Sequence, residues 1–365
     1  MTVLTRRGLN RATLERQLLL RRADVPALDV IERLVGLQAQ DPDPPYIGLW
    51  NRITTFRLDD LTRLLYRREV VRATLLRGTQ HLVTAEDYLW LRPLLQPMLD
   101  RWQKGAFGRL TAGLDLTELA ATARTALSQD TLTRPELGRA LTERWPGRDP
   151  VALARSAQGL LPVVHPPPDG TWGRSGTTPF ALADRWLGRP LADAPSAREL
   201  VLRYLASFGP ATVKDIQAWS GMTRLREVVE PLRSRLRVFR NEAGAELFDL
   251  PEAPRPDPDV PAPVRFLAAL DNVVLGHADR TRMMTDRQRR HTIVEAAMTV
   301  DGFVHGLWSI KRHKSTATLV VRLFDPLPRG GEAAVVEEGT RLLRFAAAEA
   351  DNHDIRFRPV DDTPG

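Results

Sequence analysis

The strongest constraint on this chain is an order of elements that recurs three times before residue 252. Each time, helical spacing of apolar residues gives way to two short apolar segments separated by a turn. In the first copy the two segments are 70–77 and 81–83, and the turn falls at Gly78. Helices followed by a strand pair are typical of a winged-helix domain, so the sequence predicts tandem winged-helix modules.

Two pairs of landmarks indicate that the second and third copies are duplicates. Thr133 and Thr212 each precede a helical pattern and have an acidic residue three positions later, as in a capping box. They lie 79 residues apart, and the aromatic residues Trp172 and Phe248 lie 76 residues apart. The near-equal spacing predicts a repeated module in which Trp172 and Phe248 occupy equivalent wing strands.

A proline-rich segment at 251–263 separates these modules from a β-rich end. Strands are expected at 266–275, 292–300, 303–310 and 316–324, followed by a closing helix at 330–350. We therefore predict a mainly α fold with β elements: three tandem winged-helix domains and a C-terminal antiparallel β-barrel. The predicted domains are 1–110, 111–192, 193–252 and 253–365.

The charge of the chain favours a polyanionic partner. Lys and Arg total 52 against 45 acidic residues, a net charge of +7. Only four of the basic residues are lysines, a bias that a GC-rich genome also produces. Codon bias does not account for the excess of positive charge, which is typical of nucleic-acid binding.

Composition also limits the cellular setting and the chemistry. The chain has no cysteine, which excludes disulfides and thiolate metal sites. No segment approaches the roughly 20 apolar residues that span a bilayer, and the N-terminus does not resemble a signal peptide. We expect a cytoplasmic monomer. The signatures of ordinary hydrolases, nucleotide-binding proteins and metalloenzymes are missing, and the seven histidines lack metal-ligand spacing, so we expect no metal and no cofactor.

One short segment has a candidate catalytic pattern. Gln38 and Gln40 lie just past the second predicted helix, in the run Gly-Leu-Gln-Ala-Gln-Asp-Pro at 36–42. Their amides would project in related directions from an irregular backbone. Two interpretations stay open from the residues alone: the glutamines cap the helix or bridge to the next strand, or they act on a ligand.

This segment resembles the glutamine-x-glutamine motif of the winged-helix DNA glycosylases of the AlkZ/YcaQ type. Pro-Pro-Tyr follows it at 44–46, and further matches lie at 76–83, 266–272, 277–282 and 300–308, in the family's order. The resemblance implies three winged helices and a β-barrel, with monofunctional excision of N7-alkylated purines from double-stranded DNA. Some family members unhook interstrand crosslinks, and some protect producers of DNA-alkylating antibiotics. Another branch carries aspartate where this chain has Gln40.

The implied chemistry does not require a carboxylate. N7-alkylguanine is already cationic, so its glycosidic bond is weak and the leaving base needs no general acid. The enzyme must instead stabilise an oxocarbenium sugar and hold a water molecule. The amide carbonyls of Gln38 and Gln40 are suited to both tasks as oriented dipoles.

Two groups of basic residues are expected to bind DNA. One is a loop that also carries His291, and the other is the tip of the hairpin predicted between 303–310 and 316–324. A solvated charged surface is the alternative for both. The candidates are Arg280, Arg282, Arg287, Arg289, Arg290, Lys311, Arg312, His313 and Lys314. Arg224 and Arg226, on the predicted recognition helix of the third module, are weaker candidates.

Two other classes of function compete with the glycosylase. A non-enzymatic winged-helix regulator would leave a sequence-specific footprint on DNA. A drug-sequestering resistance protein would bind the drug in the absence of DNA. Three modules without a ligand domain, together with the glutamine pair, argue against the regulator.

Overall fold

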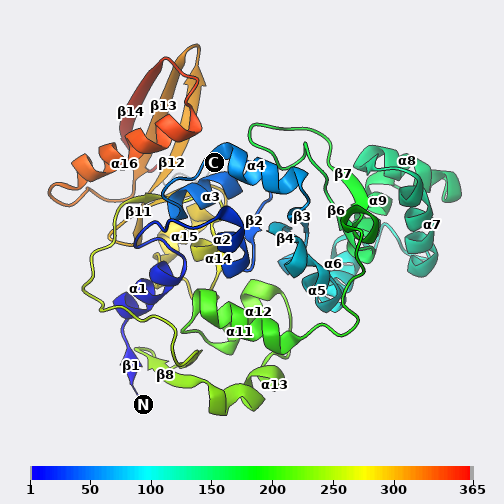
Figure 1. The fold of residues 1–365 in the computed structure, drawn as a ribbon, viewed down its shortest axis with the longest axis horizontal. Coiled ribbons are helices and arrows are strands. Elements are labelled where there is room, and N and C mark those ends of the chain that lie inside the picture. The colour runs from blue at the N-terminus through cyan, green and yellow to red at the C-terminus, as the bar shows by residue number, and fades with distance from the viewer. Residues whose placement is uncertain (1, 362–365) are drawn as a thin grey trace.

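The structure is a computed structural model that describes residues 2–361, and it mixes helices and strands along the chain (Figure 1). The described strands form four sheets, three with three strands and one with five. The small sheets use strands that end by Asp249, and the five-stranded sheet begins at Arg265. Helical groups with small sheets therefore precede a β-rich part, as the sequence predicts.

The first group of elements holds Gln38 in an edge strand. Strand β4 is central and runs antiparallel to both β2 and β3. The predicted strand pair is confirmed, and β2 is an additional strand. The elements are α1 (Arg6–Arg16), α2 (Ala27–Arg33), β2 (Leu37–Gln38), α3 (Pro44–Arg52), α4 (Leu58–Tyr66), β3 (Val70–Thr74), the 3-10 helix η1 (Leu76–Gly78), β4 (Gln80–Thr84), α5 (Ala85–Leu94) and α6 (Gln96–Phe107).

The second and third groups each contain the expected capping box, at Thr133 and at Thr212. The second group comprises α7 (Leu116–Gln129), β5 (Leu132–Thr133), α8 (Arg134–Arg144), α9 (Pro150–Leu160), β6 (Val163–Val164), β7 (Pro179–Leu182) and α10 (Ala183–Leu187). The third comprises α11 (Ala197–Phe208), α12 (Val213–Ser220), α13 (Arg226–Val229), the 3-10 helix η2 (Glu230–Arg235), β8 (Arg237–Asn241) and β9 (Glu246–Asp249). Strand β1 (Val3–Leu4) pairs in parallel with β8. The exact domain boundaries stay a prediction.

Two expectations for these groups are wrong. Trp172 lies in a turn rather than on a wing strand, where its ring contacts Tyr46 edge-on at a centroid distance of 5.6 Å. In the second group the buried aromatic residue on a strand is Phe180 of β7, whereas Phe248 lies buried on β9 as expected. The helix expected over 222–233 begins only at Arg226 and passes into η2 at Glu230, where Pro231 supplies no backbone N–H.

The C-terminal part is an open sheet covered by one long helix. Its elements are β10 (Arg265–Phe266), α14 (Asn272–Leu275), α15 (Asp286–Thr292), β11 (Ala296–Val300), β12 (Phe303–His313), β13 (Thr316–Leu323), α16 (Gly331–Ala346) and β14 (Asn352–Pro359). The strand order is β10-β11-β12-β13-β14, and within residues 2–361 the edge strands β10 and β14 do not pair with each other. Closure into a barrel is therefore not observed.

Three details of this part also correct the prediction. The apolar run 266–275 forms a short strand and then a helix, because the Asp271 side chain caps α14 by accepting from the Val273 N–H. The segment expected as a strand from 292 starts in α15, and its strand begins at Ala296. Strand β14 was not predicted, and it runs parallel to β13 because α16 carries the chain back between them.

The first group and the C-terminal sheet share one core. The Trp50 ring of α3 stacks on Phe345 of α16 at a centroid distance of 5.7 Å. The Asn51 side chain donates to the Phe266 carbonyl over 2.7 Å. These contacts fix the glutamine segment relative to the C-terminal sheet. No helix within residues 2–361 has both the length and the apolar character needed to cross a membrane.

Candidate active site

The turn before the glutamines requires a glycine. Val35 and Gly36 both have positive φ, +56° and +95°. A Cβ added to Gly36 would lie 2.5 Å from Val83 Cγ1 and 2.8 Å from the Leu82 carbonyl oxygen. The close approach lets Leu37 and Gln38 pair with β4, opposite Leu82 and His81. The turn thus sets the register of Gln38.

Arg72 holds the backbone beyond β2. Its Nε donates to the Ala39 carbonyl and its Nη2 to the Gln40 carbonyl, each over 2.8 Å. The guanidinium also pairs with Asp169, and Arg72 is 4% exposed. One buried side chain therefore fixes both peptide units that carry Gln40, a role that the sequence analysis did not assign to Arg72.

Gln38 is buried and oriented by a cation. Its Oε1 accepts from Arg77 Nη2 over 2.8 Å and from Thr79 Oγ1 over 3.5 Å. Within residues 2–361, its Nε2 has no hydrogen-bond partner. Because both lone pairs of Oε1 already accept a bond, one of them long, Gln38 keeps both of its Nε2 donors for a ligand.

Gln40 differs from Gln38 in exposure. It is exposed, and its Oε1 accepts only a long bond of 3.4 Å from the Gln80 N–H. Neither glutamine side chain caps α2, because both reach toward the start of β4. The bridging alternative therefore describes their resting contacts, and Gln40 is the amide that a ligand can engage with less displacement.

His81 lies beside this pair as a neutral group. Burial, reinforced by the charge of Arg77, lowers its pKa to about 3. Its Nδ1 lies 3.0 Å from the Thr79 carbonyl, so this nitrogen carries the proton and donates it. With so low a pKa, His81 is not suited to act as a proton donor near neutral pH.

Arg77 is the second functional candidate that the sequence analysis missed. It has a left-handed φ of +58°. Its Nη1 donates to the Trp219 carbonyl near the end of α12, where a positive charge is favoured. Burial, and then the charge of Arg280, lower its pKa to about 10. The segment 76–83 was recognised as a motif, but no spacing rule connects Arg77 to Gln38.

The expected basic loop divides into a buried part and an exposed part. Arg282 is 5% exposed, and its Nη1 donates to Thr13 Oγ1 and the Pro210 carbonyl. It is a structural cation that DNA cannot reach, so its prediction as a DNA contact is wrong. The other members are partly or fully exposed: Arg280, half-buried, and Arg287, Arg289 and Arg290 on α15.

The predicted hairpin is present, but β12 extends to His313, so only Lys314 of the four basic residues lies in the turn, and the other three point to two faces. Lys311 and His313 face the open side of the sheet. Arg312 faces the other side, where its Nη2 donates to the Ala346 carbonyl over 2.6 Å and its Nη1 pairs with Glu349. Lys314 occupies the turn with φ +51°. Arg312 therefore already has an ion-pair partner within the protein.

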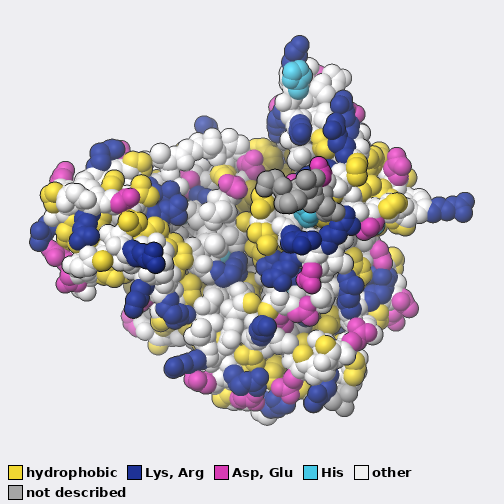
Figure 2. All heavy atoms as spheres, turned by 180° about the vertical axis from the view of Figure 1, so that it is seen from behind, with side chains coloured by type: hydrophobic (Ala, Val, Ile, Leu, Met, Phe, Trp, Pro, Cys, Tyr) yellow, Lys and Arg dark blue, Asp and Glu magenta, His cyan; other side chains and the backbone are white. Residues whose placement is uncertain are grey.

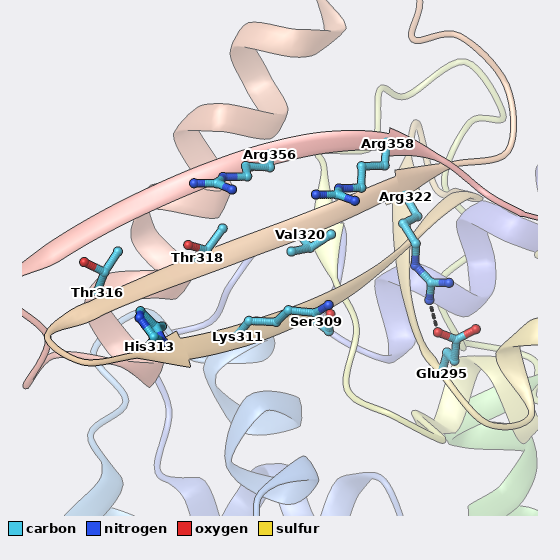
Figure 3. A pocket seen from close by; sticks show the side chains of 10 residues that line it. All are labelled: Glu295, Ser309, Lys311, His313, Thr316, Thr318, Val320, Arg322, Arg356 and Arg358. Atoms are coloured by element: carbon cyan, nitrogen blue, oxygen red, sulfur yellow. Dashed lines mark hydrogen bonds and ion pairs between the residues drawn. The ribbon is translucent and has the colours of Figure 1, made fainter.

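The open face of this sheet is a basic hollow (Figure 3). It encloses about 770 Å³ and is lined by Lys311 and His313 of β12, Arg322 of β13, and Arg356 and Arg358 of β14, among others. Arg322 pairs with Glu295, and Arg356 with Asp354. Figure 3 shows Arg356 and Arg358 projecting from β14 over the same side as Lys311.

Arg356 and Arg358 were missed because β14 was not predicted. Their signal was present in the sequence as two arginines separated by one residue, which share a face in a strand. Figure 2 shows that Lys and Arg side chains gather on the projecting sheet and below it over α15. Burial raises the pKa of Asp43, just after the glutamine segment, while the Gly173 N–H and the charge of Arg312 on the hairpin act in the opposite direction.

Comparison with known proteins identifies relatives of the whole chain. The family model described as DNA glycosylase AlkZ-like matches residues 31–345. An interstrand DNA cross-link repair glycosylase of Streptomyces sahachiroi is 23% identical, over 91% of this chain and 94% of its own length. The solved structure of the Streptomyces sahachiroi DNA glycosylase AlkZ superposes with a TM-score of 0.73 at 20% identity. It covers 98% of this chain and 100% of that one.

Proposed function

Because the chain belongs to the AlkZ-like DNA glycosylase family, we propose that it hydrolyses the N-glycosidic bond of N7-alkylated purines in duplex DNA. The observation that carries this proposal is the placement of two neutral amides, Gln38 and Gln40, at one end of β4 with no carboxylate in their hydrogen bonds. Such a site suits a leaving base that is already positively charged. We propose a monofunctional enzyme that acts as a monomer and uses no metal or cofactor.

The two glutamines have different roles in this proposal. Gln40 is exposed and weakly held, so its carbonyl oxygen turns toward the sugar and the attacking water as positive charge develops on C1′. Gln38 is fixed by Arg77 and presents its Nε2 donors from a set position. Gln38 thereby orients the water or the sugar without a change in protonation.

DNA would follow the exposed basic residues of the C-terminal part. Arg287, Arg289 and Arg290 on α15, and Lys311, His313, Lys314, Arg356 and Arg358 on the sheet, offer phosphate contacts. These contacts position the duplex without distinguishing its sequence. Arg312 contributes to a lesser extent because Glu349 already pairs with it.

The proposal also includes the winged-helix interpretation of the fold and a role in crosslink repair. The three helical groups with small sheets are interpreted as winged-helix modules, and the open sheet as the counterpart of the expected barrel. The curated relative is named for interstrand crosslink repair. We propose that this chain also unhooks crosslinks or removes bulky adducts, either in DNA repair or in self-resistance to an alkylating antibiotic.

The test is incubation with a duplex that carries one N7-methylguanine, followed by mild alkali and strand separation. A glycosylase produces a single alkali-labile break at the lesion and releases the free methylated base. An untreated duplex of the same sequence should stay intact. A sequence-specific footprint without base release would support a regulator, and drug binding without DNA would support a sequestering protein.

A further inference from the structure

Arg77, Arg280 and Arg289 form a file that leads from Gln38 to the surface. The first two are held on α12, because Arg77 donates to the Trp219 carbonyl and the turn before Arg280 donates to Asp215. Arg77 donates to Gln38 Oε1, and the charge of Arg280 lowers the pKa of Arg77 further. The charge of Arg289 on α15 in turn contributes to the lowered pKa of Arg280, after burial. The file therefore connects the candidate catalytic amide with the exposed basic surface.

The middle member of the file lacks partners. Arg280 Nε and Nη1 are buried, and among residues 2–361 no hydrogen-bond acceptor meets them. Nor does any carboxylate of that range form an ion pair with Arg280 or Arg77. Buried guanidinium N–H groups without acceptors are costly, so native proteins rarely leave them unpaired. These two nitrogens are therefore donors that an acceptor of a ligand can engage.

The backbone holds Arg280 in place. The Ala278 N–H donates to Asp215 Oδ1 over 2.9 Å, and the Met283 N–H donates to the Arg280 carbonyl over 2.9 Å. Asp215 is itself fixed by the capping box of α12. The unpartnered guanidinium is therefore presented from an anchored turn, which is what a binding group requires.

We propose that Arg280 binds one of the two backbone phosphates that directly flank the lesion nucleotide. A guanidinium fork can donate charge-assisted bonds to phosphate oxygens, and Nε and Nη1 of Arg280 each have N–H groups without an acceptor. Arg289 forms the outer side of this phosphate site, and Arg77 forms the inner side, where it acts as a positioning residue for Gln38. This inference rests on the proposed function, and it assigns the phosphate contact nearest the chemistry to one residue.

The placement also resolves an electrostatic conflict. A cationic N7-alkylpurine and a developing oxocarbenium ion would be repelled by two nearby guanidinium groups that have no counter-ion. A bound phosphate supplies the counter-ion, so DNA binding converts a repulsive site into one that tolerates positive charge. Charge at the site would then be balanced only when the lesion strand is correctly seated.

The experiment combines a backbone modification with a side-chain change. Duplexes carrying a tetrahydrofuran abasic analogue are prepared with a neutral methylphosphonate at one of the three phosphates on either side. Dissociation constants are measured for the wild type, Arg280→Gln, Arg280→Lys and the control Arg329→Gln. Arg329 is exposed and has no assigned DNA contact. The readout is binding, so it does not depend on excision.

One flanking methylphosphonate should weaken wild-type binding about tenfold and leave the binding of Arg280→Gln nearly unchanged. Arg280→Lys keeps the charge but loses the fork, so it should retain part of this sensitivity. Arg329→Gln should behave as the wild type. Equal methylphosphonate effects in the wild type and Arg280→Gln at every position would overturn the proposal. If Arg280→Gln removes the methylphosphonate effect but the wild type releases no base from N7-methylguanine DNA, the phosphate site stands and the proposed function is rejected.

Discussion

Arg52 of α3 and Asp271, the residue that caps α14, form a two-pronged ion pair that is fully enclosed. Nη1 lies 2.9 Å from Oδ2 and Nη2 lies 2.8 Å from Oδ1, with side-chain exposures of 0% and 1%. The pair joins the group that carries the glutamines to the C-terminal part. By contrast, the ion pair between Arg144 and Glu118 is open to solvent, with side-chain exposures of 60% and 43%.

Asp271→Asn should destabilise the protein strongly. It leaves the Arg52 charge buried without its counter-ion, which costs about 3 to 5 kcal/mol in comparable pairs. Chemical denaturation measures this as a lower free energy of unfolding. The control is Glu118→Gln, which breaks an exposed pair with Arg144 and should cost less than about 1 kcal/mol. Equal effects of the two variants would contradict the joining role of the buried pair.

Stability should decrease as the pH falls below about 6.5. Burial lowers the pKa of His81, His165 and His277 to about 3, so they stay neutral in the folded chain. The unfolded chain binds a proton at each of them near pH 6.5, and the free energy of unfolding falls by up to about 1.4 kcal/mol per pH unit per histidine.

Denaturation at pH 7.5, 6.5 and 5.5 checks this dependence, because carboxylates contribute mainly at lower pH. His165→Gln removes one of the three groups and should reduce the slope between pH 6.5 and 5.5 by about a third. The same free energy of unfolding at pH 7.5 and 5.5 would show that these histidines are not enclosed as described.

Arg282→Gln should lower the stability of the protein, whereas Arg290→Gln should weaken DNA binding. Arg282 is buried, so its loss should lower the melting temperature and affect DNA binding only through the folded fraction. Arg290 is exposed, so its loss should leave folding unchanged and reduce the slope of log affinity against log salt by about 0.9. Melting curves and a salt titration of affinity separate the two. An Arg282→Gln variant that is as stable as the wild type but binds DNA more weakly would show that Arg282 contacts DNA.

The open sheet face should bind DNA regardless of sequence. Replacing Lys311 and Arg358 together by Gln should weaken binding to unrelated duplexes by the same factor and lower the salt slope by roughly two contacts. Arg329→Gln, which removes an exposed charge without an assigned DNA contact, is the control. An unchanged slope in the double variant would remove this face from the DNA path.

The sequence predicted the elements whose signals are local. The capping boxes at Thr133 and Thr212, the strand pair around Gly78 and the basic hairpin tip all depend on neighbouring residues. Contacts between residues far apart in the sequence could not be predicted from such local signals. The Trp172 ring was assigned to a strand by its spacing, but Tyr46 and Phe345 from other parts of the chain hold it in a turn.

The candidate site shows the same division. Gln38 and Gln40 were found because they form a motif within five residues, whereas Arg72 and Arg77 act on them from 32 to 39 positions away. Arg282 was grouped with Arg280 by proximity in sequence, but Thr13 and Pro210 enclose its guanidinium. Acceptors within the protein separate a structural arginine from a ligand-binding one, and composition carries no information about them.

The central claim is that Gln38 and Gln40 are catalytic. Gln→Ala at either position should leave the protein folded and its DNA affinity unchanged, because neither side chain contributes to the apolar core or the basic surface. Gln38→Ala also removes an acceptor of buried Arg77 and should lower the melting temperature. Gln40→Asp restores the pattern of the other branch and should keep partial activity, since a carboxylate also holds water. Gln129→Ala, at an exposed helix end, is the matched control.

The most direct test is the single-turnover rate of base release from a duplex with one N7-methylguanine. Gln40→Ala and Gln38→Ala should each be slower than the wild type by about 10- to 1000-fold, the loss expected for one preorganised dipole. Gln129→Ala should match the wild type. Folded alanine variants that bind the damaged duplex and release the base at the wild-type rate would contradict the account.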